Sequence, residues 1–221
     1  MISLGRQTNL FIVIGKRLKR KINVYAIGGT AMMFLGLKES TLDIDLVFEN
    51  QKDRADFKEV IKSIGYEEMN SFKIYGGREN RPEMMTLGDE RFDLFVDNVV
   101  DFVFSDSIKK RAKQLHQFGD NFLLKIADPH DVFVMKCATY RTKDLNDANS
   151  IVINTEVNWD LIVNEAKNQK ELGRERAILD LGYFLEQLEL KFKAPVPKKV
   201  LDELWRMLKK QADKKDGKSG R

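Results

Sequence analysis

The sequence is poor in the residues that form covalent and metal cross-links. It contains one cysteine, Cys137, and two histidines among 221 residues. A single cysteine excludes an intrachain disulfide, so a reducing compartment is the simpler expectation. His116 and His130 have no cysteine, histidine or glutamate partner at metal-site spacing, and we interpret both as incidental. A zinc-bound or disulfide-bonded scaffold is therefore not expected.

Long apolar stretches are also missing. No run approaches the roughly 18 residues that a membrane-spanning helix needs. The apolar segment 10–14 is too short for the core of a signal peptide, and its positive cluster follows it instead of preceding it. We therefore expect a cytoplasmic protein with no membrane partner. The chain also lacks an internal repeat and a G-x-S-x-G nucleophile motif.

Apolar and charged residues are present in the proportions of an ordinary globular protein, 43% and 33% respectively. A chain of 221 residues can bury a sizeable core as one domain, with or without a helical extension. The net charge of +4 permits a nucleic-acid partner without requiring one.

One stretch, residues 28–45, combines a glycine turn with two carboxylates. Residues 23–27 have the pattern of a short buried strand, and Gly28-Gly29 permits a sharp turn with the backbone close to a ligand. We expect Thr30 to cap the helix that follows, whose first N–H groups would suit a phosphate.

Asp43 and Asp45 open the next predicted strand. Side chains two positions apart in a strand point the same way, so both carboxylates share a face while Ile44 enters the core. Carboxylates about 7 Å or less apart repel one another unless a cation lies between them. Mg²⁺ is the natural cation, because it binds carboxylates together with substrate phosphates.

The order Gly-Gly-Thr, a gap, and Asp-hydrophobic-Asp-hydrophobic resembles the signature of the DNA polymerase β-like nucleotidyltransferase superfamily. That superfamily carries a third acid on a later strand, and Asp93 within the segment FDLFV matches it. Thr41 of the motif is retained, whereas Glu39 stands where many relatives carry arginine. The resemblance implies that Asp43, Asp45 and Asp93 form the catalytic set and bind two Mg²⁺ ions.

A second set of residues is similar to the helical motif of the toxin-like nucleotidyltransferases of the AbiEii group: Asp131, Lys136, Arg141, Lys143 and residues 144–147, DLND. On spacing alone, Lys136 in its apolar run either snorkels to solvent or meets an anion. The resemblance implies that it binds the triphosphate. Asp144 either caps a helix over 145–153 or borders the nucleotide site. The resemblance also admits an antitoxin partner.

These patterns together predict an α+β protein of the α/β-type nucleotidyltransferase fold. We expect a mixed β-sheet flanked by helices over residues 1–126, a C-terminal helical bundle over 127–210, and a disordered charged tail over 211–221. Helices are predicted at 6–20, 31–37, 52–64, 107–116, 130–140, 145–153, 159–172, 175–190 and 198–210. Strands are predicted at 23–27, 43–48, 66–75, 83–87, 91–96 and 121–126, with a strand or turn at 101–104.

The predicted activity is Mg²⁺-dependent transfer of a nucleoside monophosphate from an NTP to an acceptor hydroxyl. The predicted nucleotide contacts are Gly28, Gly29, Thr30, Thr41, Lys136 and Asp144. The acceptor stays open among RNA such as tRNA 3′ ends, a small molecule and a protein side chain. Basic helices favour RNA weakly, because a solvated helix face is the more ordinary explanation of such a basic run. The alternative is a catalytically inactive relative that serves as a nucleotide- or protein-binding scaffold.

Overall fold

A computed structural model describes residues 1–139 and 141–216. The chain divides into two compact units, one from Met1 to Val132 and one from Phe133 onward, and each is described by itself. The division falls inside helix α6 (Pro129–Cys137), whereas the sequence predicted it after residue 126. The first turn of α6 belongs to the first unit, because Arg111 binds the carboxylate of Asp131 at 2.6 Å.

The first unit is built on a mixed β-sheet of nine strands, counted over the described residues. Its main path runs β10-β11-β2-β4-β7-β6-β5. The pairs β11–β2 and β4–β7 are parallel, and the other neighbours on the path are antiparallel. The strands of the path are β2 (Ile22–Ala26), β4 (Ile44–Phe48), β5 (Glu67–Met69), β6 (Glu83–Leu87), β7 (Glu90–Val96), β10 (Gln114–Phe118) and β11 (Phe122–Ile126).

Short elements complete this unit. Strands β8 (Asn98–Val99) and β9 (Phe102–Val103) continue from β7, while β1 (Ile2–Ser3) and β3 (Ser40–Thr41) form a separate pair. Three short helices connect the strands: α2 (Gly28–Phe34), α4 (Phe72–Tyr75) and α5 (Asp106–Arg111).

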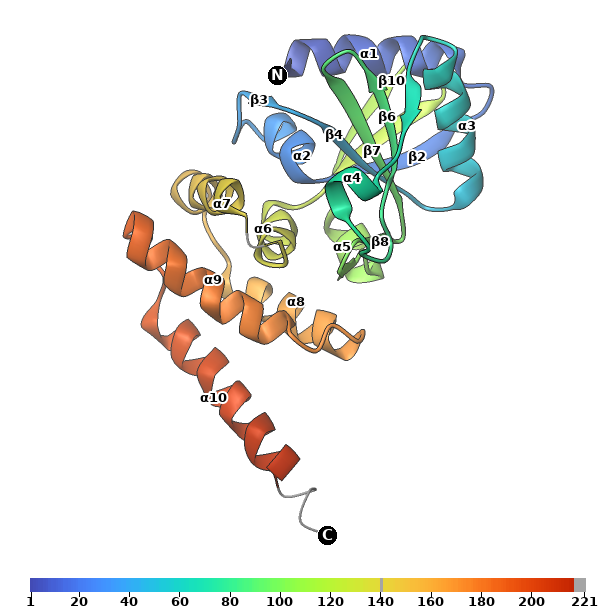
Figure 1. The fold of residues 1–221 in the computed structure, drawn as a ribbon. Coiled ribbons are helices and arrows are strands. Elements are labelled where there is room, and N and C mark those ends of the chain that lie inside the picture. The colour runs from blue at the N-terminus through green and yellow to red at the C-terminus, as the bar shows by residue number, and fades with distance from the viewer. Residues whose placement is uncertain (140, 217–221) are drawn as a thin grey trace. The chain divides into compact units, whose positions relative to one another are not determined.

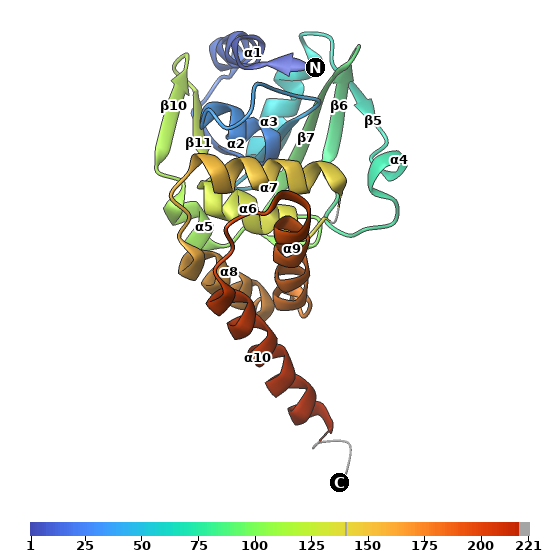
Figure 2. The ribbon, with the colours of Figure 1, turned by 90° about the vertical axis from the view of Figure 1, so that its left-hand side faces the viewer.

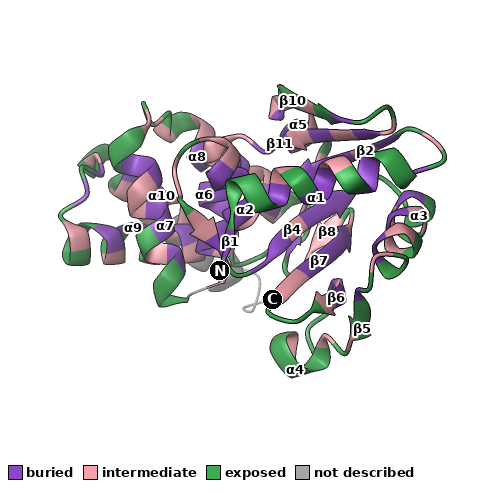
Figure 3. Ribbon diagram, turned by 90° about the horizontal axis from the view of Figure 1, so that it is seen from above, coloured by how far each residue is buried: buried purple, intermediate pink, exposed green. Residues whose placement is uncertain are grey.

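Two longer helices, α1 (Leu4–Arg17) and α3 (Gln51–Lys62), pack together on one face of the sheet (Figure 1). The core beneath them is aromatic. The Phe57 ring of α3 lies 5.2 Å from Phe48 of β4 and 5.6 Å from Phe92 of β7, measured between centroids. The central strands are coloured as buried in Figure 3, and the outer sides of both helices as exposed. The helices thus shield one face of β4 and β7.

Two segments of the first unit differ from their predicted structure. Residues 66–75 form β5 and then α4, because Asn70 Oδ1 accepts a hydrogen bond from the Phe72 N–H at 2.9 Å and turns the chain. Figure 2 shows α4 beside β5 at the edge of the sheet. Helix α5 ends at Arg111 instead of near residue 116, because residues 114–118 pair with β11 as β10.

The second unit is helical. After α6 it contains α7 (Thr142–Asn154), α8 (Trp159–Glu171), α9 (Ala177–Phe192) and α10 (Lys198–Asp216). Leu181, Leu185 and Leu188 of α9 and Ile162 of α8 are fully buried. Helix α10 extends into the predicted tail 211–221, of which residues 217–221 lie outside the described part. The predicted α+β class with C-terminal helices is confirmed. Among described helices, none combines the length and apolarity that crossing a bilayer requires.

Candidate active site

The predicted acidic pair lies where the chain enters β4. Ile44 and Phe48 are fully buried, and Phe48 packs against α3. Because side chains alternate along a strand, Asp43 and Asp45 lie on the opposite face, away from α1 and α3. Asp43 is buried and Asp45 is half-buried. The two carboxylates therefore share one face, as expected from the sequence.

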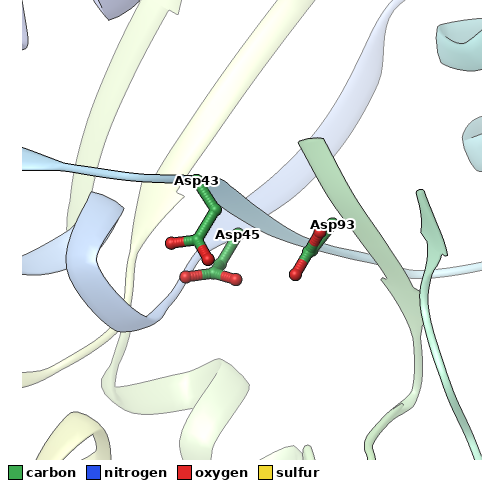
Figure 4. A group of neighbouring side chains, drawn as sticks. All are labelled: Asp43, Asp45 and Asp93. Atoms are coloured by element: carbon green, nitrogen blue, oxygen red, sulfur yellow. The ribbon is translucent and has the colours of Figure 1, made fainter. Parts of the chain in front are cut away.

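The third acid, Asp93, comes from β7, which runs parallel to β4 and pairs Asp93 with Asp45. One carboxylate oxygen from each of Asp43, Asp45 and Asp93 lies within 4.8 Å of the others. Figure 4 shows the three carboxylates pointing into a common space beside the two strands. We refer to these three residues as the carboxylate cluster. It joins segments that are distant in the sequence.

The turn after β2 holds Asp45 in place. Gly28 has a φ of +55°, and a Cβ at this position would lie 2.5 Å from Asp45 Oδ2. The Ile27 N–H donates to the Asp45 carbonyl at 3.2 Å, and the Asp45 N–H donates to Thr30 Oγ1 at 3.1 Å. Glycine is therefore required here both for its backbone conformation and for the close approach of the carboxylate.

Both threonines of the motif form hydrogen bonds with the acidic pair. The N-cap of α2 is Ile27, so the predicted capping role of Thr30 is wrong; its hydroxyl is occupied by the Asp45 N–H. Thr41 donates to Asp43 Oδ1 at 3.3 Å. A Cβ at Gly29 would clash with Thr41 Oγ1. Gly29 therefore leaves room for the threonine that orients Asp43.

Arg91 completes the cluster, although the motifs gave it no predicted role. Its Nε donates to Asp93 Oδ1 at 2.8 Å, and its Nη2 donates to Asp93 Oδ2 at 3.1 Å. The same Nη2 also bonds Asp43 Oδ2. Arg91 precedes Asp93 by two positions on β7, so the period of a strand is the signal that could have placed both on one face.

Tyr75, the last residue of α4, is a second neighbour that the sequence did not reveal. Its hydroxyl donates to Asp93 Oδ2 at 2.6 Å, and its ring meets the Phe95 ring edge-on. No spacing rule pointed to this tyrosine, because the residues of α4 were predicted to continue a strand. Both oxygens of Asp93 therefore accept hydrogen bonds.

Burial controls protonation in this group. It raises the pKa of Asp93 above the ordinary value, although the Arg91 guanidinium and the Tyr75 hydroxyl act in the opposite direction. Burial also raises the pKa of Tyr75, and the carboxylates of Asp93 and Asp45 raise it further, so its hydroxyl remains a donor. For Arg91, burial works to lower the pKa, but Asp93 and Asp43 outweigh it and the guanidinium stays charged.

The donor chemistry of the carboxylate cluster fits a divalent cation. All three side chains offer carboxylate oxygens, the ligands that Mg²⁺ prefers, and the described cluster contains neither histidine nor cysteine. The guanidinium of Arg91 already lies against two of the acids as a positive charge. A metal ion bound by the three acids would offset the repulsion among their carboxylates.

Lys136 and Asp144 lie together in the second unit. Lys136 Nζ donates to Asp144 Oδ1 at 3.0 Å and to Asp147 Oδ2 at 2.6 Å, and all three side chains are buried. Burial works to lower the pKa of Lys136, but the two carboxylates outweigh it and raise it. Of the two interpretations that spacing allowed, snorkelling to solvent is wrong. The lysine meets internal anions.

Asp144 is held by several donors. Helix α7 has Arg141 as its N-cap, so the alternative that Asp144 caps this helix is wrong. Asp144 accepts hydrogen bonds from Arg141 Nε at 2.7 Å and from Thr139 Oγ1. Burial works to raise the pKa of Asp144, but Lys136, Arg141 and Thr139 outweigh it and lower the pKa. We refer to the following residues as the Lys136 network: Lys136, Thr139, Arg141, Asp144 and Asp147.

The predicted site residues thus fall into two groups. The first unit brings together Gly28, Gly29, Thr30, Thr41, Asp43, Asp45 and Asp93. The second unit holds Lys136 beside Asp144.

Comparison with known proteins adds a family. Residues 9–181 match a family described as "Nucleotidyltransferase of unknown function (DUF6036)". No curated protein matches the chain significantly. Among solved structures, the chain is similar to ANT(2″)-Ia, crystallised in complex with adenylyl-2″-tobramycin. The sequence identity is 15%, the TM-score is 0.45, and the match covers 82% of this chain and 98% of that chain.

Proposed function

The chain belongs to the DUF6036 family of nucleotidyltransferases, and we propose that it transfers a nucleoside monophosphate from a Mg²⁺-bound NTP to an acceptor hydroxyl. The observation that carries this proposal is the carboxylate cluster, whose oxygens lie within 4.8 Å of one another on two parallel strands. A cluster of like charges is costly to hold together without a cation, so its presence favours metal-dependent chemistry.

Asp43, Asp45 and Asp93 are the proposed ligands of two Mg²⁺ ions. When bound, these ions would neutralise charge on the triphosphate and polarise its α-phosphate. The contacts around the cluster hold each ligand in a fixed orientation. Thr41 bonds Asp43, the Ile27–Thr30 turn bonds the backbone of Asp45, and Tyr75 bonds Asp93. Such preorganisation is what catalysis by charge stabilisation requires.

Asp93 is the proposed general base for the acceptor hydroxyl. It lies in the same cluster as Asp43 and Asp45 but on a separate strand, and a carboxylate at that place can accept the proton of a hydroxyl bound beside the metal ions. We also propose that Gly28, Gly29, Thr30 and Thr41 lie along the triphosphate, since neither glycine places a side chain between the backbone and a ligand.

Lys136 and Asp144 remain part of the proposed nucleotide site on the strength of the AbiEii resemblance. Within the Lys136 network the ammonium already has two carboxylate partners. A phosphate contact would therefore require Lys136 to exchange one of these carboxylates for a phosphate oxygen.

RNA, including tRNA, is the acceptor that we propose, and a toxin-like role with an antitoxin partner is part of the same proposal. The net charge of +4 suits a polyanion. The basic helices support an RNA acceptor less strongly than their sequences suggest. Arg20 binds Asp53 and Asp56, and Arg111 binds Asp131, so part of this charge is neutralised internally. A small-molecule or protein hydroxyl is the competing acceptor.

The alternative function is an inactive nucleotide- or protein-binding scaffold. One observation favours it: Arg91 already pairs with two of the three acids. In a scaffold this arginine would stand permanently in place of a metal ion.

The test is incubation of the purified protein with each α-labelled NTP, Mg²⁺ and total cellular RNA, followed by gel separation. Asp45→Asn keeps the shape of the side chain and removes one charge, and it should reduce transfer by roughly a hundredfold or more. Asp97→Asn is the matched control, because Asp97 directly follows the end of β7 but is exposed and lies outside the cluster. It should transfer like the unmodified protein.

The outcomes separate the proposals. Label on one RNA class from the unmodified protein and from Asp97→Asn, but not from Asp45→Asn, supports the activity and identifies the acceptor. Equal labelling by all three proteins contradicts the role of the cluster. The complete absence of label, with small molecules and proteins also offered as acceptors, favours the scaffold.

A further inference from the structure

Arg91 differs from the other ion-paired arginines described in the first unit because the acids that it binds belong to the carboxylate cluster. Arg6 of α1, for example, binds Glu90, the residue before Arg91 on β7, at 2.6 Å. The Arg6 side chain is 52% exposed and faces a single carboxylate. The Arg91 side chain is only 20% exposed and reaches two acids of the carboxylate cluster. Its position is therefore defined by the cluster itself.

The geometry of Arg91 is that of a cation shared between ligands. Its Nη2 bonds both Asp43 Oδ2 and Asp93 Oδ2, oxygens that come from different strands. A divalent cation bound between these two oxygens would take the position that Nη2 occupies. Two positive charges cannot share one pair of carboxylate oxygens at bonding distance without strong repulsion. Arg91 and the metal ion thus exclude one another from this position.

We propose that Arg91 is a built-in competitor of the divalent cation: it occupies the metal position between Asp43 and Asp93 in the metal-free protein, and metal binding displaces it. This inference rests on the metal site of the proposed function and adds the device that sets the metal affinity of that site. A state in which Arg91 bridges the two acids does not bind metal, so it lowers the apparent affinity by the fraction of molecules that occupy it.

Tyr75 is suited to hold Asp93 through this exchange. Its hydroxyl is a neutral donor, and it bonds Asp93 Oδ2 without adding positive charge to the cluster. When the guanidinium leaves, Asp93 retains this hydrogen bond, so its orientation does not depend on Arg91. The second oxygen, Oδ1, loses its arginine donor and is released.

The test is calorimetric titration of Mn²⁺ and Mg²⁺ into the nucleotide-free protein, with thermal unfolding measured in parallel in chelator and in metal. Arg91→Met removes the charge and keeps most of the side-chain volume. If the bridging state outnumbers the open state by ten to one, this variant should bind metal about tenfold more tightly. Its unfolding midpoint should fall in chelator, because the acids lose their cation, and should recover when metal is added.

Two further variants make the result interpretable. Arg6→Met breaks the ion pair with Glu90, the residue next to Arg91 on β7, and should leave metal affinity unchanged. Asp45→Asn removes a proposed ligand other than the two acids that Arg91 bridges, and it should weaken metal binding.

Each result decides a separate point. If Asp45→Asn weakens metal binding while Arg91→Met binds metal no more tightly than the unmodified protein, Arg91 is not a competitor, although the metal site stands. If Asp45→Asn binds metal like the unmodified protein, the metal site of the proposed function fails. Tighter binding by Arg91→Met together with unchanged binding by Arg6→Met supports the inference.

Discussion

The carboxylate cluster and the Lys136 network use the same kinds of side chain with opposite charge balance. In the cluster, three carboxylates lie together and the guanidinium of Arg91 binds two of them. In the network, Lys136 and Arg141 face Asp144 and Asp147, so positive and negative charges are equal in number. The acids of both groups are buried or half-buried, where an unbalanced charge is expensive.

This difference indicates what each group can do alone. In the network each buried carboxylate has a cationic partner, and the group contributes to the second unit as a connected set of hydrogen bonds. The cluster brings three acids together, and a divalent cation would relieve the repulsion among them. Charge balance, more than the presence of acids, therefore separates a structural polar group from a candidate metal site.

The largest expected effect on stability is at Lys136. Replacing it by methionine should leave two buried carboxylates without their shared cation and reduce the free energy of unfolding by about 3–5 kcal/mol. Urea denaturation followed by circular dichroism measures this loss. By contrast, removing an acid from the carboxylate cluster relieves repulsion and should cost far less.

Lys167→Met is the control for this prediction. Lys167 lies in the same unit and binds Glu203 at 3.0 Å, but both side chains are partly exposed to solvent. An exposed pair contributes about 1 kcal/mol or less, so this variant should unfold almost like the unmodified protein. Equal losses from the two lysine variants would contradict the structural importance of the network.

The glycine turn tests the carboxylate cluster alone, because it contacts Asp45 and no residue of the Lys136 network is involved in that contact. Gly28→Ala forces alanine into a positive φ and places its Cβ 2.5 Å from Asp45 Oδ2. The expected cost is about 1–3 kcal/mol of unfolding free energy, together with weaker metal binding as Asp45 is displaced. Thermal unfolding and metal titration measure the two effects separately.

Gly36→Ala is the control that separates backbone strain from steric contact with a neighbouring side chain. Gly36 also has a positive φ, +72°, but no atom lies within 4 Å of the position that its Cβ would take. This variant should show only the backbone cost of about 1–2 kcal/mol and normal metal binding. If both glycine variants bind metal equally well, the turn does not control Asp45.

The sequence predicted the parts of this site that depend on local pattern. The strand of Asp43 and Asp45, the strand of Asp93 and the glycine turn all follow from alternation and turn chemistry within short segments. The resemblance then joined the three acids, which no local rule could do. The observed register, with Asp45 opposite Asp93, is a consequence of sheet pairing.

The parts that the sequence did not reveal depend on contacts between distant segments. Tyr75 reaches Asp93 only because α4 interrupts a predicted strand at the edge of the sheet. Lys136 is paired internally because α7 brings Asp144 and Asp147 to it. Arg91 was predicted in part, since its strand position was expected but its bond to Asp43 was not. Propensity and period carry no information about such partners.

The smallest expected effect is a difference in pH dependence between the two groups. The folded-state pKa of Asp93 is raised above its ordinary 3.8, so its contribution to stability is present at low pH and is lost as pH rises from 3.8 through the folded pKa. The folded-state pKa of Asp144 is lowered below 3.8, so its contribution is present above 3.8 and is lost as pH falls through the folded pKa.

Urea unfolding in chelator between about pH 3 and pH 7 measures these contributions, on the order of 1 kcal/mol for each unit of pKa shift. The difference between the unmodified protein and Asp93→Asn should decline with rising pH, and the difference for Asp144→Asn should increase. Opposite slopes would show that the cluster is held under repulsion while the network is held by attraction. Slopes of the same sign would mean that Arg91 balances the cluster as completely as Lys136 and Arg141 balance the network, and the metal-free cluster would then have no need of a second cation.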